Sequence, residues 1–227
     1  MPLRYICPGL TEPTLSLSNA IDPIFDQTQW EFGFFTTYNT LWTGITPALQ
    51  MATRLLQSEP VMRSLRKLKY GQRRRDGKTK KTYLDWNSAD DDTTRAIENT
   101  GVRNDLIALA TKLRFVFGSF LDHGGASLHH VPSQIQAMHL VGLNELGKRY
   151  DLSKHGNTTT LRHDGSRHYI VINDAYRQFY SMPPANRTPF QNLRTAWVFA
   201  SSLVHELIHA FNAREITDGK ENFHEPY

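Results

Sequence analysis

The sequence predicts an α+β domain in which a small, partly antiparallel sheet packs on helices. Three observations carry this prediction. Apolar residues recur at spacings of three and four over residues 38–57, as in an amphipathic helix with Pro47 as a kink. Residues 169–172 read Tyr-Ile-Val-Ile, which is typical of a strand. Residues 189–213 carry apolar side chains around most of a helical circumference, which predicts a central buried helix.

Length and composition favour one globular domain over residues 1–227. A chain of 227 residues can bury a sizeable core, and 39% hydrophobic against 21% charged residues is unlike a disordered protein. No run of 18 apolar residues occurs, so we expect no membrane span and no membrane partner. Cys7 is the single cysteine, which favours a reducing intracellular compartment, the cytoplasm or the nucleus.

The first half of the chain is predicted to be mainly helical behind an irregular arm. Four prolines interrupt residues 1–30, which favours an arm lying on the domain. A short helix is predicted over residues 60–68 and a mostly buried helix over residues 104–121. Residues 134–146 fit a helix or a strand equally well.

Basic charge is concentrated in one segment of the chain. The formal net charge is +4, but between Arg63 and Lys81 ten Lys or Arg residues stand against the single acid Asp76. Such a block attracts nucleic acid or another polyanion, and the alternative is a solvated loop that binds nothing. Residues 71–95 are polar, charged and interrupted by glycine, so we expect them to form a mobile insertion.

A hairpin is predicted before the strongest strand. Asp164-Gly165 lies between two β-prone arms, and this dipeptide suits a type I′ turn, which needs a positive φ at both central residues. We therefore expect a hairpin within residues 158–173, whose second arm ends in the strand of residues 169–173.

The start of the last helix is marked by its capping residues. Thr188 suits the N-cap, Pro189 suits the first helical position, and Gln191 completes a capping box with the threonine. The helix is expected to continue for about 25 residues, through Ala213.

This helix contains the sequence His-Glu-Leu-Ile-His at residues 205–209. Histidines four positions apart lie on one helical face, about 6 Å apart at Cβ, so His205 and His209 can share one Zn²⁺. Glu206 lies beside that face, where a carboxylate can take a proton from a water activated by the metal. A buried polar trio would be costly without a function, so we expect a buried metal site.

The run from Val204 to Phe211 resembles the motif of the HExxH zincin metallopeptidases, and its His-Glu-x-x-His-Ala form is most similar to the SprT-type proteases. The resemblance covers residues 158–227. It implies a zincin-like fold, in which an edge strand borders the cleft and precedes the active-site helix. The strand of residues 169–173 stands in the place of that edge strand.

The resemblance also implies a function. Zinc would be held by His205 and His209, Glu206 would act as general base, and the reaction would be hydrolysis of a peptide bond. The substrate, a peptide or protein, would lie extended and pair with the edge strand.

A tetrahedral catalytic zinc needs a third protein ligand. The candidates are Glu221, His224 and Glu225, which lie 12, 15 and 16 residues past His209. His224 is favoured because a SprT-like site has a histidine at about this distance. Either glutamate would instead give a site of two histidines and one carboxylate, and a ligand beyond Tyr227 is a further alternative.

The sequence thus predicts a zinc metallopeptidase, and three alternatives stay open. One is a SprT-like protease that acts on nucleic-acid-bound proteins through residues 63–81. Another is a non-catalytic, metal-stabilised binding protein, and the third is a metal-dependent enzyme with a non-peptide substrate. The tryptophans are expected to be packing residues. The other histidines are expected at the surface or in loops, among them His123, His129, His130, His139, His163 and His168.

Overall fold

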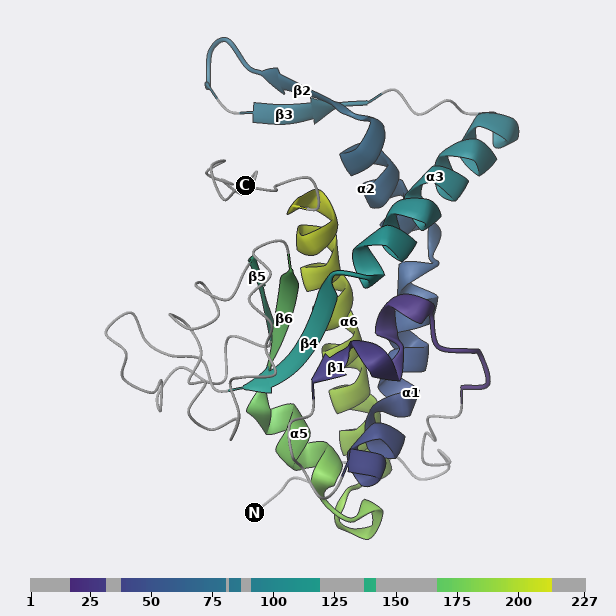
Figure 1. The fold of residues 1–227 in the computed structure, drawn as a ribbon, viewed down its shortest axis with the longest axis vertical. Coiled ribbons are helices and arrows are strands. Elements are labelled where there is room, and N and C mark those ends of the chain that lie inside the picture. The colour runs from purple at the N-terminus through teal and green to yellow at the C-terminus, as the bar shows by residue number, and fades with distance from the viewer. Residues whose placement is uncertain are drawn as a thin grey trace, which may run out of the picture.

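The computed structural model describes residues 17–31, 38–80, 82–86, 91–118, 137–141 and 167–213. A four-stranded sheet has the order β1-β4-β6-β5 (Figure 1). Parallel pairing joins β1 (Trp30–Glu31), β4 (Leu113–Gly118) and β6 (His168–Asn173), and β5 (Ala137–Val141) runs antiparallel at one edge. The predicted α+β class with a small, partly antiparallel sheet is confirmed.

Two long helices support this sheet. α6 (Pro189–Ala213) packs against β5 and β6, and α1 (Tyr38–Leu56) packs along α6 (Figure 1). The remaining helical elements are shorter or peripheral: η1 (Pro23–Phe25), η2 (Gln27–Gln29), α2 (Glu59–Tyr70), α3 (Asp92–Ala110), α5 (Asp174–Ser181) and η5 (Pro184–Asn186). No helix in the described part of the chain is both long and apolar enough to cross a bilayer.

Aromatic side chains join the sheet to α6. The ring of Trp30 stacks on Phe115 of β4, with centroids 4.8 Å apart, and on Phe199 of α6 at 6.2 Å. The N-terminal arm contributes Phe25, which is fully buried and lies 5.9 Å from Phe115. The expected arm therefore lies on the domain over residues 17–29, and residues 1–16 are outside the described part.

The second half of the predicted helix over residues 104–121 is wrong. α3 ends at Ala110, and β4 begins at Leu113, where five of six strand residues are buried. A strand buried on both faces is a continuous apolar run, which hydrophobic periodicity cannot separate from a buried helix. Residues 134–146, which fitted either structure, contain the strand β5.

The predicted hairpin is also wrong, because β6 is an interior strand. His168 lies opposite Leu113 of β4 on one side and opposite Val141 of β5 on the other. Both sides of β6 are therefore occupied by β4 and β5, which come from distant parts of the chain, and residues 158–163 lie outside the described part. The turn residues Asp164 and Gly165 lie outside the described part, and the edge strand next to α6 is β5.

The start of α6 agrees with the sequence. Gln191 donates its backbone N–H to Thr188 Oγ1 at 3.1 Å, and Thr188 donates its own to Gln191 Oε1 at 2.8 Å. This is the predicted capping box, and the helix covers the predicted 25 residues. Trp197 departs from the expected packing role, since it is 53% exposed.

The segment of residues 71–95 contains regular structure that the sequence did not indicate. Strands β2 (Gln72–Arg75) and β3 (Thr82–Asp85) pair antiparallel as a separate two-stranded hairpin. Figure 1 shows this hairpin projecting beyond α2 at one end of the molecule. The segment ends in the first turn of α3, which is capped by the Asp91 side chain.

Candidate metal centre

The last third of α6 brings together the three residues of the predicted motif. The Nε2 atoms of His205 and His209 lie 3.0 Å apart, and the two rings meet edge to face at 75°. One ligand atom from each of His205, Glu206 and His209 can be chosen so that all lie within 4.8 Å of one another. The helix therefore assembles the histidine pair by its own geometry, because residues i and i+4 share a face.

The geometry of this pair fits a zinc ion. With an ion about 2.0–2.1 Å from each Nε2, the angle between the two nitrogens would be roughly 95°, about 15° below the tetrahedral angle, and a widening of the pair by about 0.3 Å would reach it. Imidazole nitrogens are also ligands that zinc prefers. The residues present therefore fit the metal that the sequence predicts.

The side chain of Glu206 is much less exposed than that of the adjacent His205. Its Oε1 lies 3.9 Å from His205 Nε2, and its side chain is 13% exposed against 68% for His205. The carboxylate is thus mostly shielded from solvent and lies close to the nitrogens of the two imidazoles. Such a position suits a group that exchanges a proton with a molecule bound there.

The site is open to solvent, which corrects the expectation that the motif is buried. His205 is exposed and His209 is partly exposed, whereas Leu203, Leu207 and Ala210 point into the core. The high cost of burying a polar trio therefore does not apply here. The core-facing side chains hold α6 in place, and the exposed face leaves the histidines accessible to an ion.

The third zinc ligand is not located by the structure. The predicted ligand His224 and its alternatives Glu221 and Glu225 lie outside the described residues, which end at Ala213. His123, His129, His130 and His163 also lie outside them. His139 lies in β5, where its backbone is opposite Ile170 of β6.

His168 departs from the expectation of a surface or loop histidine. It begins β6, is 1% exposed, and donates its backbone N–H to the carbonyl of Lys112 at 3.1 Å. Burial, and then the positive charge of Lys112, lower its pKa from 6.5 to about 4. The imidazole is therefore neutral at pH 7 and belongs to the core rather than to the metal site.

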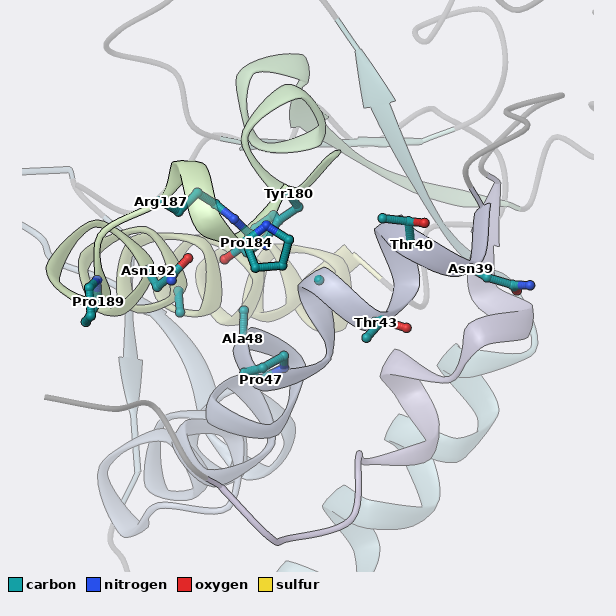
Figure 2. A pocket seen from close by; sticks show the side chains of 12 residues that line it. Asn39, Thr40, Thr43, Pro47, Ala48, Tyr180, Pro184, Arg187, Pro189 and Asn192 are labelled. Atoms are coloured by element: carbon teal, nitrogen blue, oxygen red, sulfur yellow. The ribbon is translucent and has the colours of Figure 1, made fainter. Parts of the chain in front are cut away.

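A pocket that the sequence did not indicate lies at the other end of α6. Its volume is about 580 Å³, and Figure 2 shows it between the first turns of α1, the η5 segment and the first turns of α6. Arg187 lies over the ring of Phe179 at 5.4 Å there, and Ala196 is the lining residue nearest in sequence to the motif. Ala196 and His205 are nine positions apart on the helix, which corresponds to roughly 13 Å along its axis. This pocket is therefore not part of the metal centre.

Comparison with known proteins finds no match to a protein-family model, to a curated protein or to a solved structure. The assignment of the site therefore rests on its own residues and geometry. On these grounds it is a candidate divalent-metal centre on the exposed face of a helix.

Proposed function

We propose that this protein is a zinc-dependent peptidase in which His205 and His209 hold the metal and Glu206 acts as general base. One observation carries the proposal: two Nε2 atoms lie 3.0 Å apart on α6, with a carboxylate between them in sequence. The zincin resemblance of residues 204–211 supplies the reaction class. We also propose His224 as the third ligand.

The chain's own residues have distinct tasks in this reaction. Zinc, when bound, acts as a Lewis acid that polarises the substrate carbonyl and acidifies water. His205 and His209 present imidazole nitrogens at a fixed spacing, because the apolar face of their helix is packed in the core. Glu206 takes a proton from the attacking water while the oxygen of that water bonds to the carbonyl carbon. The same carboxyl group then gives that proton to the amide nitrogen as the C–N bond breaks, and the base is regenerated.

The sheet offers a place for an extended substrate. β5 is an edge strand of the described sheet, it runs antiparallel to β6, and it packs against α6. A peptide added to its outer edge would form main-chain hydrogen bonds like those of a further strand. An antiparallel edge strand beside the motif helix supports a zincin-like fold, with β5 in the role expected of residues 169–173.

Substitution of the proposed base tests the function. The purified full chain, loaded with zinc, is assayed on an unfolded protein and on a quenched-fluorescence peptide library. Wild type should hydrolyse peptide bonds, and this hydrolysis should stop when the metal is chelated. Glu206→Gln keeps the shape of the side chain but cannot take a proton, so it should lose at least about 100-fold in rate and retain zinc.

A matched variant separates the base from a general charge effect. Asp92→Asn makes the same carboxylate-to-amide change at a side chain that is 96% exposed on α3, and its rate should equal wild type. Hydrolysis at the wild-type rate in Glu206→Gln would show that Glu206 is not the base. Zinc binding with no hydrolysis of any peptide would instead favour the metal-stabilised binding protein or a non-peptide substrate.

A further inference from the structure

The hairpin β2–β3 carries exposed positive charge away from the rest of the domain. All four residues of β2 are exposed, and three of them are the consecutive arginines 73–75. The register places Arg73 opposite Leu84 and Arg74 opposite Tyr83. Because neighbouring strand residues point to opposite faces, the arginines put guanidinium groups on both faces of the ribbon.

Two of the ten basic residues in the block of residues 63–81 are not available to a partner. Arg66 is 2% exposed and forms ion pairs with Glu59 and Glu98. Lys69 pairs with Asp105 at 2.7 Å. The block of ten cations predicted to attract a polyanion is therefore smaller than the sequence indicates. The exposed cations in the described part of the block are Arg63 and Lys67 on α2, and Arg73, Arg74, Arg75, Lys78 and Lys80 on the hairpin.

The single acid within the block fixes the turn of the hairpin. Asp76 Oδ1 accepts hydrogen bonds from the backbone N–H of Lys78 at 2.9 Å and of Thr79 at 2.6 Å, and from Thr79 Oγ1 at 2.9 Å. Lys80 has a φ of 59°, and its carbonyl accepts a hydrogen bond from Arg75 Nε at 3.1 Å. These hydrogen bonds stabilise the turn, and Lys78 and Lys80 are exposed at its tip.

Residues 72–85 contain six Lys or Arg and two Asp, so the hairpin carries a net charge of +4. Arg74 is paired with Asp85 at 2.8 Å, and among the described residues no acidic side chain is paired with Lys78 or Lys80. This density of charge on a small ribbon selects a partner with closely spaced negative charges.

We propose that this hairpin binds the phosphate backbone of duplex nucleic acid. A two-stranded ribbon fits the major groove, which is about 12 Å wide in B-form DNA. Arginine is suited to phosphate because its planar guanidinium donates two parallel hydrogen bonds. The guanidinium groups on the two faces of the ribbon would then meet the phosphates on the two sides of the groove.

The composition of the tip argues for nucleic acid rather than an anionic membrane. Residues 76–80 read Asp-Gly-Lys-Thr-Lys and contain no apolar side chain. A segment that inserts at a bilayer surface needs apolar residues beside its cations. Tyr83, which is 48% exposed, lies within β3 rather than at the tip.

The hairpin and the metal motif lie toward the same end of the molecule. Figure 1 shows the hairpin at the same end of the molecule as the C-terminal end of α6. A bound duplex would therefore lie toward the end of α6 that carries the metal motif. The inference itself does not rest on the proposed peptidase, since it depends only on the charges of the hairpin.

Binding of a fluorescent 20-base-pair DNA duplex to the full chain, followed by anisotropy over a range of salt concentrations, tests the proposal. The hairpin variant combines Arg73→Gln, Arg75→Gln and Lys78→Gln. The control variant combines Arg54→Gln, Arg103→Gln and Arg194→Gln, which removes the same charge from exposed sites on helices outside the basic block. Circular dichroism should show that both variants fold, because every changed side chain is exposed.

We expect the hairpin variant to bind the duplex at least tenfold more weakly at 0.1 M salt, and the control to change by less than twofold. The slope of log K against log salt should become shallower by about 0.9 for each phosphate that the variant no longer neutralises. Equal weakening in the two variants, or no binding by wild type at low salt, would overturn the proposal. So would hairpin-dependent binding to phosphatidylserine vesicles or polyglutamate without binding to the duplex.

Discussion

The Nε2 atoms of His205 and His209 lie 3.0 Å apart on the exposed face of α6. The two ring nitrogens are thus close enough to share one ion, because helical spacing places both rings on one face. The opposite face of the helix is fixed by Leu203 and Leu207, which are 1% and 0% exposed. Little rearrangement is therefore needed to bind a metal, which is the condition for a well-defined site.

The third ligand is tested by substitutions beyond the motif. His224→Ala should weaken zinc binding more than Glu221→Ala or Glu225→Ala, because neutral imidazole suits zinc at least as well as a carboxylate. The measurement is competition for zinc against a chromophoric chelator. A larger loss in either glutamate variant would identify a site of two histidines and one carboxylate instead.

The ion pairs of Arg66 should matter for stability. Arg66→Met keeps the apolar part of the side chain but leaves Glu98, 15% exposed, without its cation, so we expect a loss of about 3 kcal/mol in unfolding free energy. Arg63→Met on the same helix removes an exposed charge and should change stability by less than about 0.5 kcal/mol. Urea denaturation measures the unfolding free energy of both variants. Equal losses would show that the burial of Arg66 does not determine its contribution to stability.

His168 should make the protein less stable in mild acid. In the unfolded chain its imidazole takes up a proton near pH 6.5, whereas in the folded protein burial and Lys112 lower the pKa to about 4. The unfolded state therefore binds more protons between these values. Stability falls as the pH drops from 6.5 to 4, by at most about 1.4 kcal/mol per pH unit from this group.

The variant His168→Gln cannot titrate in this range. Its unfolding free energy, measured in urea at pH 4.5, 5.5 and 7, should fall less steeply with acid than that of wild type. Parallel curves for the two proteins would mean that His168 does not cause the acid sensitivity.

Local sequence patterns predict much of the fold, but they do not indicate which distant segments pair as strands. The capping box of Thr188 and Gln191 marks the start of α6, and helical spacing finds α1 and α6, because these signals lie within a few residues of each other. The sequence of β4 is indistinguishable from part of a helix, since burial on both faces hides the strand period. The partners of β6 lie about 30 and 55 residues away in the chain, and no local signal indicates them.

The candidate site, too, is predicted only as far as local sequence signals reach. The spacing of His205 and His209 is enough to place both rings on one helical face, and the structure brings their nitrogens together. Their exposure does not follow from the sequence, because the apolar composition of α6 suggests burial all round, yet its outer face is open at His205. The pairing of Arg66 and Lys69 is missed for a similar reason: a charge count does not show which cations face acids on α3.

The zinc content of the purified protein tests the central claim most directly. After growth with added zinc and removal of loosely bound ions, elemental analysis should find about one zinc per wild-type chain. His205→Ala and His209→Ala should each lower that content strongly, whereas His168→Gln, which removes a buried imidazole at the start of β6, should retain it. Wild type without zinc, or a histidine-motif variant that holds as much zinc as wild type, would contradict the account.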